Sequence, residues 1–193
     1  MSEQRVPTVP PASRADIARW AEWLIRRTAP HLLHQPGRYP VLEVFDNIEK
    51  HVSSLTSGVD DLGPGIEGCC TPDGQVLLSE TTYKNLIGDV GRARFTAVHE
   101  ICHGLHHRQH VKQILIEGRV PTLYRRSAIP PYVNPEWQAD EFASAVLMPA
   151  PALRQLAAGY PAGLSVGYVS GVFDVSYSAA KYRLEKLGIP YLM

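Results

Sequence analysis

The sequence FTAVHEICHGLHH, at residues 95–107, contains two histidines four positions apart, His99 and His103, and Glu100 beside the first. Residues four apart on an α-helix lie one turn above each other on the same face, so both imidazoles can reach one ion. Glu100 is rotated about 100° from His99 and borders that ion without having to bind it. A base must lie there to take a proton from water on the metal. This H-E-x-x-H spacing is typical of zinc metalloproteases and predicts a metal site.

The other side chains of this helix bear on the alternative interpretation, a surface helix with two solvated histidines. Apolar side chains stand at Phe95, Val98, Ile101, Cys102 and Leu105. They make the helix too hydrophobic for a free surface element. A half-buried helix that carries two histidines and a glutamate needs partners for those polar groups, and a metal would supply them.

The composition bounds the class of protein. At 193 residues the chain fits one domain that can bury a core. Its formal net charge is zero and its pI is about 7.1, so no bulk electrostatic case exists for binding nucleic acid or a membrane. Three cysteines make no disulfide framework, and the sequence has neither a signal peptide nor an 18-residue apolar run. We therefore expect a cytoplasmic protein.

The segments before the His99 helix predict helices and one β-hairpin. Three prolines predict a loose tail over residues 1–12, followed by a single domain over 13–193. Ser13 and Asp16 form a capping-box pattern that opens a helix ending near Thr28. Apolar spacing and turn residues then predict a helix over 41–52, a loop or irregular strand over 53–65, a hairpin over 66–79 and a short helix over 81–87.

The segments after the His99 helix predict a loop and four more helices. Mixed composition and three prolines predict a loop or flap over 108–134. Asn134 and Pro135 are an N-cap and a proline at the first helical position, and they predict a helix ending near Met148. Helical patterns recur over 151–158, 165–172 and 176–187.

A catalytic zinc usually has three protein ligands and a water, so a third ligand is needed. One metalloprotease design places it after a glycine turn in the same segment, but the glycine position holds His106 and the third-histidine position holds Gln109. Another design takes a glutamate from a second helix. The segment EWQADEFA, at 136–143, offers Glu136 as the ligand and Asp140, one turn later, as hydrogen-bond acceptor for the other N–H of a ligand histidine. By spacing alone, both acids are equally well explained as the solvated face of an amphipathic helix.

Two stretches, FTAVHEICH at 95–103 and EWQADEFASAVLMP at 136–149, together resemble the ImmA/IrrE family of metallo-endopeptidases. The resemblance implies an α+β fold, a mainly helical zincin-like peptidase core with a small antiparallel sheet beside the active-site helix. It implies His99, His103 and Glu136 as ligands of Zn²⁺, or of another divalent metal such as Mn²⁺, and Glu100 as the catalytic base. Asp140 falls on the family's Asn/Asp position. One departure is Cys102, which stands where the family usually has glycine; we expect the small thiol to fit and to make the site sensitive to oxidation.

The C-terminal segment over 165–188 resembles a helix-turn-helix. Its basic residues Lys181, Arg183 and Lys186 could face DNA phosphates. The alternative is a packing subdomain whose apolar residues complete the core, and the zero net charge favours it. The apolar residues in question are Val166, Val169, Phe173 and Leu184.

The function that the sequence predicts is a zinc-dependent endopeptidase that cleaves a helix-turn-helix transcriptional repressor and so derepresses mobile-element or stress genes, as many members of the resembled family do. Candidates for the donor that stabilises the oxyanion are Tyr124, Tyr132, His106 and His110. The alternatives are a DNA- or repressor-binding regulator with a structural metal site, and a toxin–antitoxin-like partner that acts by association. Membrane binding and direct nucleic-acid binding are not favoured.

Overall fold

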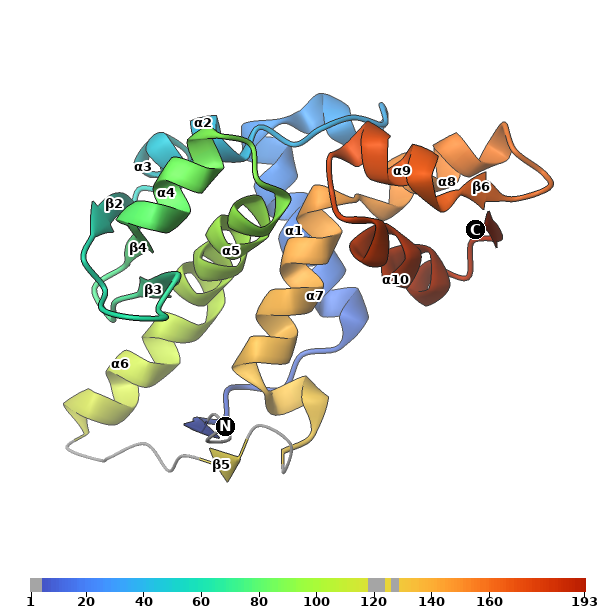
Figure 1. Cartoon of the computed structure of the whole chain (residues 1–193). Coiled ribbons are helices and arrows are strands. Elements are labelled where there is room, and N and C mark those ends of the chain that lie inside the picture. The colour runs from blue at the N-terminus through green and yellow to red at the C-terminus, as the bar shows by residue number, and fades with distance from the viewer. Residues whose placement is uncertain (1–4, 118–123, 126–128) are drawn as a thin grey trace.

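Two helices, α5 (Gly91–Cys102) and α7 (Pro135–Leu147), lie side by side at the centre of the molecule (Figure 1). The computed structural model describes residues 5–117, 124–125 and 129–193. Helix α1 (Arg14–Thr28) packs against α7. The facing apolar sides of these helices form the larger of two cores, together with one face of a small sheet. The predicted α+β, mainly helical architecture is confirmed.

The caps read from the sequence begin helices α1 and α7 as expected. Ser13 Oγ accepts a hydrogen bond from the backbone N–H of Asp16 (3.2 Å), whose carboxylate accepts one from the backbone N–H of Ser13 (2.9 Å). Asn134 Oδ1 accepts from the backbone N–H groups of Glu136 and Trp137 (3.0 and 3.4 Å). Such caps satisfy donors that an α-helix leaves unpaired at its first turn, which is why these patterns locate helix starts well.

The sheet has the order β2-β4-β3 and lies beside α5. The predicted hairpin is present: β3 (Gly68–Cys70) pairs antiparallel with β4 (Gln75–Ser79), and Cys69 lies opposite Leu77. β2 (Thr56–Asp60), in the region expected to be a loop or irregular strand, pairs with β4 in parallel. The sheet is therefore mixed, not antiparallel as expected, because β2 pairs in parallel with β4. β3 is the edge strand that contacts α5.

The remaining elements of the N-terminal half cover the sheet and the central helices. Asn47 divides the helix expected over 41–52, and its side-chain amide donates to the backbone carbonyl of Glu43 at 2.9 Å. Side chains of this type compete with the helical backbone for hydrogen bonds. The elements are η1 (Pro30–Leu33), α2 (Val41–Asp46), α3 (Ile48–His51) and α4 (Glu80–Ile87).

The chain after α5 stays helical, so the loop expected over 108–134 is wrong for its first part. A π-helical turn, η2 (His103–His107), follows α5 directly, and α6 (Arg108–Ile116) continues from it. Residues 105–117 contain no proline or glycine and are mostly good helix formers. The rest of the expected flap includes 118–123 and 126–128, which lie outside the described residues; β5 (Tyr124–Arg125) and the 3-10 turn η4 (Pro131–Val133) are the elements described there.

Residues 5–12 differ from the expected loose tail, of which 1–4 lie outside the described residues. β1 (Arg5–Val6) pairs antiparallel with β5. Val9 and Ala12 are buried, and their backbone N–H groups donate to the carbonyls of Val133 and Tyr132 (3.0 and 2.8 Å). The prolines keep this segment extended, and the hydrogen bonds hold it against the start of α7.

The C-terminal residues form a subdomain with its own small core, which lies beside the central helices (Figure 1). Val166, Val169, Phe173 and Leu184 are all buried in it, as the packing interpretation expected. Arg183 is only 7% exposed, and its Nε donates to the carbonyl of Met148 at 3.1 Å, so it does not face solvent as a phosphate contact would. The elements are α8 (Ala150–Ala158), β6 (Leu164–Ser165), α9 (Val166–Phe173), α10 (Tyr177–Leu187) and β7 (Tyr191–Leu192). Among the described residues, no helix has the length and apolar character needed to cross a membrane.

Candidate metal centre

Three side chains from three elements converge between α5 and α7. His99 comes from α5, His103 begins η2, and Glu136 lies in the first turn of α7. The two histidine Nε2 atoms are 3.0 Å apart, and each is 3.6 Å from an oxygen of Glu136. Ligands of one tetrahedral zinc are separated by roughly 3.3 Å, given bonds of about 2.0–2.1 Å. Two imidazole nitrogens and a carboxylate at these separations fit a divalent metal ion.

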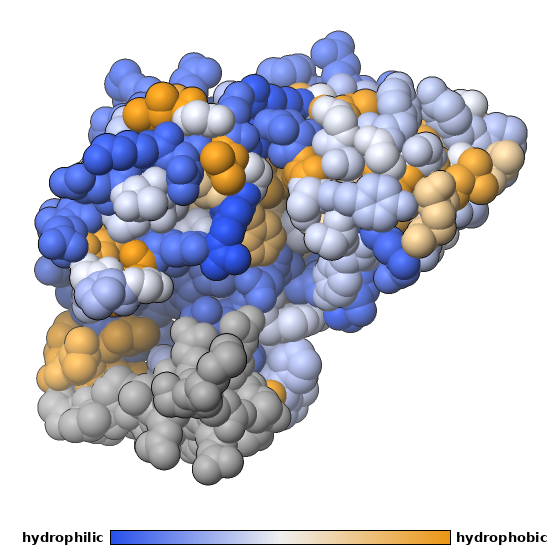
Figure 2. All heavy atoms as spheres, viewed as in Figure 1, coloured by the Kyte–Doolittle hydropathy of each residue, from blue (hydrophilic) through white to orange (hydrophobic). Residues whose placement is uncertain are grey.

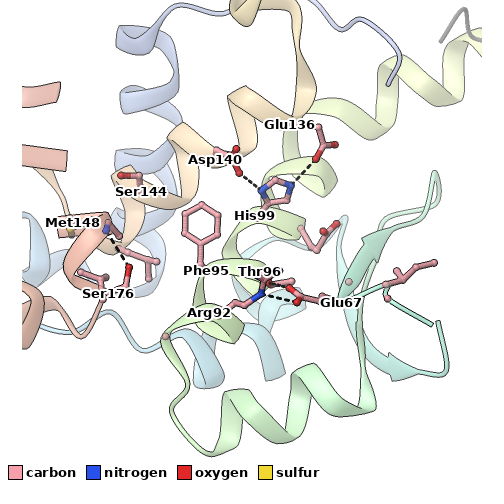
Figure 3. A pocket seen from close by; sticks show the side chains of 18 residues that line it. Glu67, Arg92, Phe95, Thr96, His99, Glu136, Asp140, Ser144, Met148 and Ser176 are labelled. Atoms are coloured by element: carbon pink, nitrogen blue, oxygen red, sulfur yellow. Dashed lines mark hydrogen bonds and ion pairs between the residues drawn. The ribbon is translucent and has the colours of Figure 1, made fainter. Parts of the chain in front are cut away.

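Asp140 lies one helical turn after Glu136 and faces the opposite side of the His99 ring (Figure 3). Its Oδ1 is 3.0 Å from His99 Nδ1. An ionised carboxylate can only accept, so Nδ1 carries the proton of that hydrogen bond. In the neutral ring this leaves Nε2 with its lone pair toward Glu136, as a metal ligand requires.

Glu100 lies next to these residues, and its half-buried side chain passes close to strand β3. A methyl group at Gly68 would lie 2.8 Å from Glu100 Cγ, so the strand passes directly over this side chain. Burial raises the pKa of Glu100 to about 7, the positive charge of His99 opposes the rise, and Glu136 adds to it. A carboxyl group that titrates near neutral pH can both take up and release a proton.

The two histidines differ in protonation. Burial and, to a smaller extent, the neighbouring His107 and His99 lower the pKa of His103 to about 3, so this ring is neutral. Burial also lowers the pKa of His99, but hydrogen bonds to Asp140 and Glu136 outweigh that effect and raise it to about 9. In the absence of metal, His99 is therefore positively charged at neutral pH and His103 is neutral.

Three of the four oxyanion donors proposed from the sequence have described side chains, and none of these three hydrogen-bonds to the cluster. The ring of His106 stacks on Trp20 with centroids 3.9 Å apart, on the side of the helix that faces α1. Tyr132 is 52% exposed, and neither it nor His110 hydrogen-bonds to the ligand candidates within the described part of the chain. The side chain of Tyr124 lies outside the described residues.

The burial of Cys102 and Cys70 determines how easily their thiols can be oxidised. Cys102 is completely buried, and burial raises the pKa of its thiol well above its usual range. Oxidation proceeds through the thiolate, so the structure argues against the expectation for Cys102. Burial also raises the pKa of Cys70, in β3, to about 12.

A cleft of about 670 Å³ opens beside the cluster, between α5 and the C-terminal subdomain. Its apolar lining includes Phe95, Leu147 and Met148 from the central helices, and Val175 from the turn before α10. Figure 3 shows the ring of Phe95 beside His99, and Figure 2 shows hydrophobic surface in the hollow between the two sides of the molecule.

Charged and polar groups lie at the other end of this cleft. Glu67 accepts hydrogen bonds from Arg92 Nε (2.7 Å) and Thr96 Oγ1 (3.1 Å) (Figure 3).

A second hollow of about 290 Å³ lies across the cluster and is lined by Cys69, Cys70 and His107 among others. Both hollows are lined by Gly68, His99, Glu100 and Glu136, so the cluster is open on two sides.

Comparison with known proteins agrees with the resemblance seen in the sequence. Residues 88–185, just over half of the chain, match the model of the Peptidase M78 family, described as the IrrE N-terminal-like domain. A solved structure, a Mycobacterium tuberculosis transcriptional regulator, is similar over 89% of this chain, with a TM-score of 0.54 and 14% sequence identity. The chain spans 46% of that structure, and at this identity the similarity concerns the fold alone. Comparison with curated proteins finds no significant match. The chain belongs to the Peptidase M78 family, with an IrrE N-terminal-like domain.

Proposed function

We propose that this protein is a metal-dependent endopeptidase whose zinc, or other divalent metal such as Mn²⁺, is held by His99, His103 and Glu136. The observation that carries the proposal is the convergence of these three ligand atoms beside Glu100, at a point that is open to hollows on two sides. The two hollows give an extended peptide room to pass the metal. Membership of a peptidase family supports the same class of reaction.

The residues of the chain have distinct roles in this proposal. A bound divalent metal supplies Lewis acidity, which lowers the pKa of water and polarises the scissile carbonyl. Glu100 takes a proton from the attacking water and delivers it to the leaving nitrogen, for which a pKa near 7 is suitable. Asp140 keeps the proton of His99 on Nδ1. The apolar side chains of the larger cleft bind the substrate and exclude water from the reacting bond.

We further propose that the substrate is a helix-turn-helix transcriptional repressor, so that cleavage releases the genes it controls. The family resemblance supports this substrate. A repressor substrate would place the reaction in the cytoplasm.

The alternative, a DNA-binding regulator with a structural metal site, has less support. Structural zinc sites are closed by four protein ligands, whereas this cluster borders two hollows. Arg183, one of three basic residues that could face DNA, is buried and bonded within the subdomain. No contact among the described residues favours a toxin–antitoxin-like role over the peptidase.

The test is Glu100→Gln, which keeps the shape of the side chain and removes its basicity. We expect the variant to bind zinc as the wild type does and to cleave roughly 100- to 10,000-fold more slowly. Candidate repressors are incubated with each protein, with and without a chelator, and the fragments are identified by mass spectrometry. Glu49→Gln, on the exposed side of α3, is the matched control. Full cleavage by Glu100→Gln, or cleavage that a chelator leaves unchanged, would contradict the proposal.

A further inference from the structure

Two polar residues outside the H-E-x-x-H motif are buried behind His103. His107, at the end of η2, is 3% exposed, and Gln138, in α7, is completely buried. His107 Nδ1 lies 2.9 Å from His103 Nδ1, and His107 Nε2 lies 3.0 Å from Gln138 Oε1. Buried polar groups of this kind are costly unless each is hydrogen-bonded, so the direction of each bond matters.

The backbone fixes the orientation of the Gln138 amide. Its Nε2 donates to two carbonyl oxygens, those of Pro10 (3.0 Å) and Tyr132 (2.8 Å). Carbonyl oxygens can only accept, so the NH₂ group must face them and Oε1 must face His107. His107 therefore donates from Nε2 to Gln138.

The hydrogen bond from His107 to Gln138 determines which nitrogen of the His103 ring carries the proton. A neutral His107 with its proton on Nε2 has a bare Nδ1, which can only accept. His103 must then donate from its own Nδ1, and its Nε2 is left bare toward His99 and Glu136. Asp140 imposes the same tautomer on His99 from the opposite side. When His99 is neutral, two separate sets of hydrogen bonds thus leave the Nε2 lone pairs of both rings facing Glu136.

The wide turn η2 makes the geometry possible. The backbone N–H of Arg108 bonds to the carbonyl of His103, five residues back, instead of the usual four. In a regular α-helix each step of four residues rotates by about 40°, whereas a wider turn keeps His107 beneath His103.

We propose that Gln138 and His107 are positioning residues for His103, which hold its proton on Nδ1 and so keep Nε2 available to bind the metal. The inference rests on the metal centre of the proposed function and is independent of whether the protein cleaves peptides. Because the backbone carbonyl of Pro10 helps to orient the Gln138 amide, the N-terminal segment also contributes to the positioning of His103.

The experiment compares two substitutions at one position in the full chain. His107→Asn places an amide oxygen where Nδ1 lies and can still accept from His103, whereas His107→Leu cannot. We expect zinc affinity, measured by competition with a chromogenic chelator, to fall about 10- to 100-fold in His107→Leu. His107→Asn should stay close to the wild type. His34→Leu, at an exposed position in a loop, is the control.

A second measurement reads the tautomers directly in the metal-free wild type, so it stands even if a variant fails to fold. Long-range ¹H–¹⁵N spectra of the imidazoles should show His103 protonated on Nδ1 and His107 protonated on Nε2. A His103 proton on Nε2, or an unchanged zinc affinity in folded His107→Leu, would overturn the inference while leaving the proposed metal site intact. A wild type that binds no zinc would remove both.

Discussion

His99 is the histidine of the centre that stays protonated at neutral pH when no metal is bound. Its burial favours the neutral ring, but Asp140 and Glu136 raise its pKa from 6.5 to about 9. At pH 7 the metal-free ring is therefore protonated on both nitrogens, and a metal must displace the proton on Nε2. The folded-state pKa lies above the unfolded one, so this proton stabilises the metal-free protein fully below pH 6.5, and the contribution is lost as the pH rises through 9.

We accordingly predict that zinc affinity rises by about tenfold per pH unit between pH 7 and 9 and levels off above 9. Titrations in a metal buffer across this range provide the measurement. Asp140→Asn removes the carboxylate that raises the pKa of His99, so its affinity should level off at a lower pH. An affinity independent of pH would show that His99 is neutral before metal binds.

The residues of the centre could be read from the sequence in part. The spacing of His99 and His103 predicted a shared face because both lie on consecutive turns of one helix. Glu136 could not be decided by spacing alone, since two separate helices must pack before its distance to the histidines is defined. His107 was missed although the spacing was visible, because a regular helix would place it about 80° away from His99.

At the scale of elements, the close approach of strand β3 to helix α5 fixes the position of the proposed base, Glu100. Gly68 leaves room for Glu100, and an added methyl group would lie 2.8 Å from Cγ of that residue and 3.1 Å from the carbonyl oxygen of Leu77. Real Cβ contacts are longer, so either the strand or the Glu100 side chain must move. The position of the proposed base is therefore set by a neighbouring strand.

Gly68→Ala is predicted to lower the rate of cleavage about 100-fold while the zinc affinity stays near that of the wild type, because the base moves and the ligands do not. Single-turnover cleavage and chelator competition measure the two quantities separately. Gly171→Ala, in α9, is the matched control, since a methyl group there meets no atom within 4 Å. If both variants cleave at the wild-type rate, the strand does not position Glu100.

Elements with a local signal were the ones that the sequence predicted well. Ser13, Asn134 and Ser176 each cap a helix that begins where expected. Asn47 interrupts a helix whose apolar spacing looked continuous, and α6 forms where only mixed composition was visible. β2 owes its place to parallel pairing with a strand about 20 residues later, which no local pattern could reveal.

At the scale of the whole molecule, a group of four charged residues joins the C-terminal subdomain to the central helices. The side chain of Arg94, in α5, is 2% exposed and donates to the carbonyl of Tyr39 at 3.1 Å. It pairs with Asp174 (3.5 Å), in the turn between α9 and α10, and with Asp89 (3.9 Å). Arg38 pairs with both aspartates. Asp174 immediately precedes Val175, so this network supports one wall of the larger cleft.

Asp174→Asn should lower the free energy of unfolding by roughly 1–3 kcal/mol, because it removes the negative charge that pairs with the buried guanidinium of Arg94. Asparagine tolerates the left-handed conformation of this turn (φ 51°), so the backbone is retained. Denaturant unfolding measures the loss, and hydrogen exchange should increase more in α9 and α10 than in α5. Asp46→Asn, at an exposed position, controls for the loss of a charge. Equal exchange in all three helices would mean that the network does not anchor the subdomain.

The backbone carbonyl of Pro10 is connected to the proposed metal centre through hydrogen bonds of Gln138 and His107. Pro10 is exposed, and the N-terminal segment that contains it supplies one of the three hydrogen bonds of the Gln138 side-chain amide. Proteolytic trimming, a bulky tag, or a binding partner that peels this segment away would leave the amide free to turn over. The affinity for zinc would then fall, although none of the proposed ligands had changed.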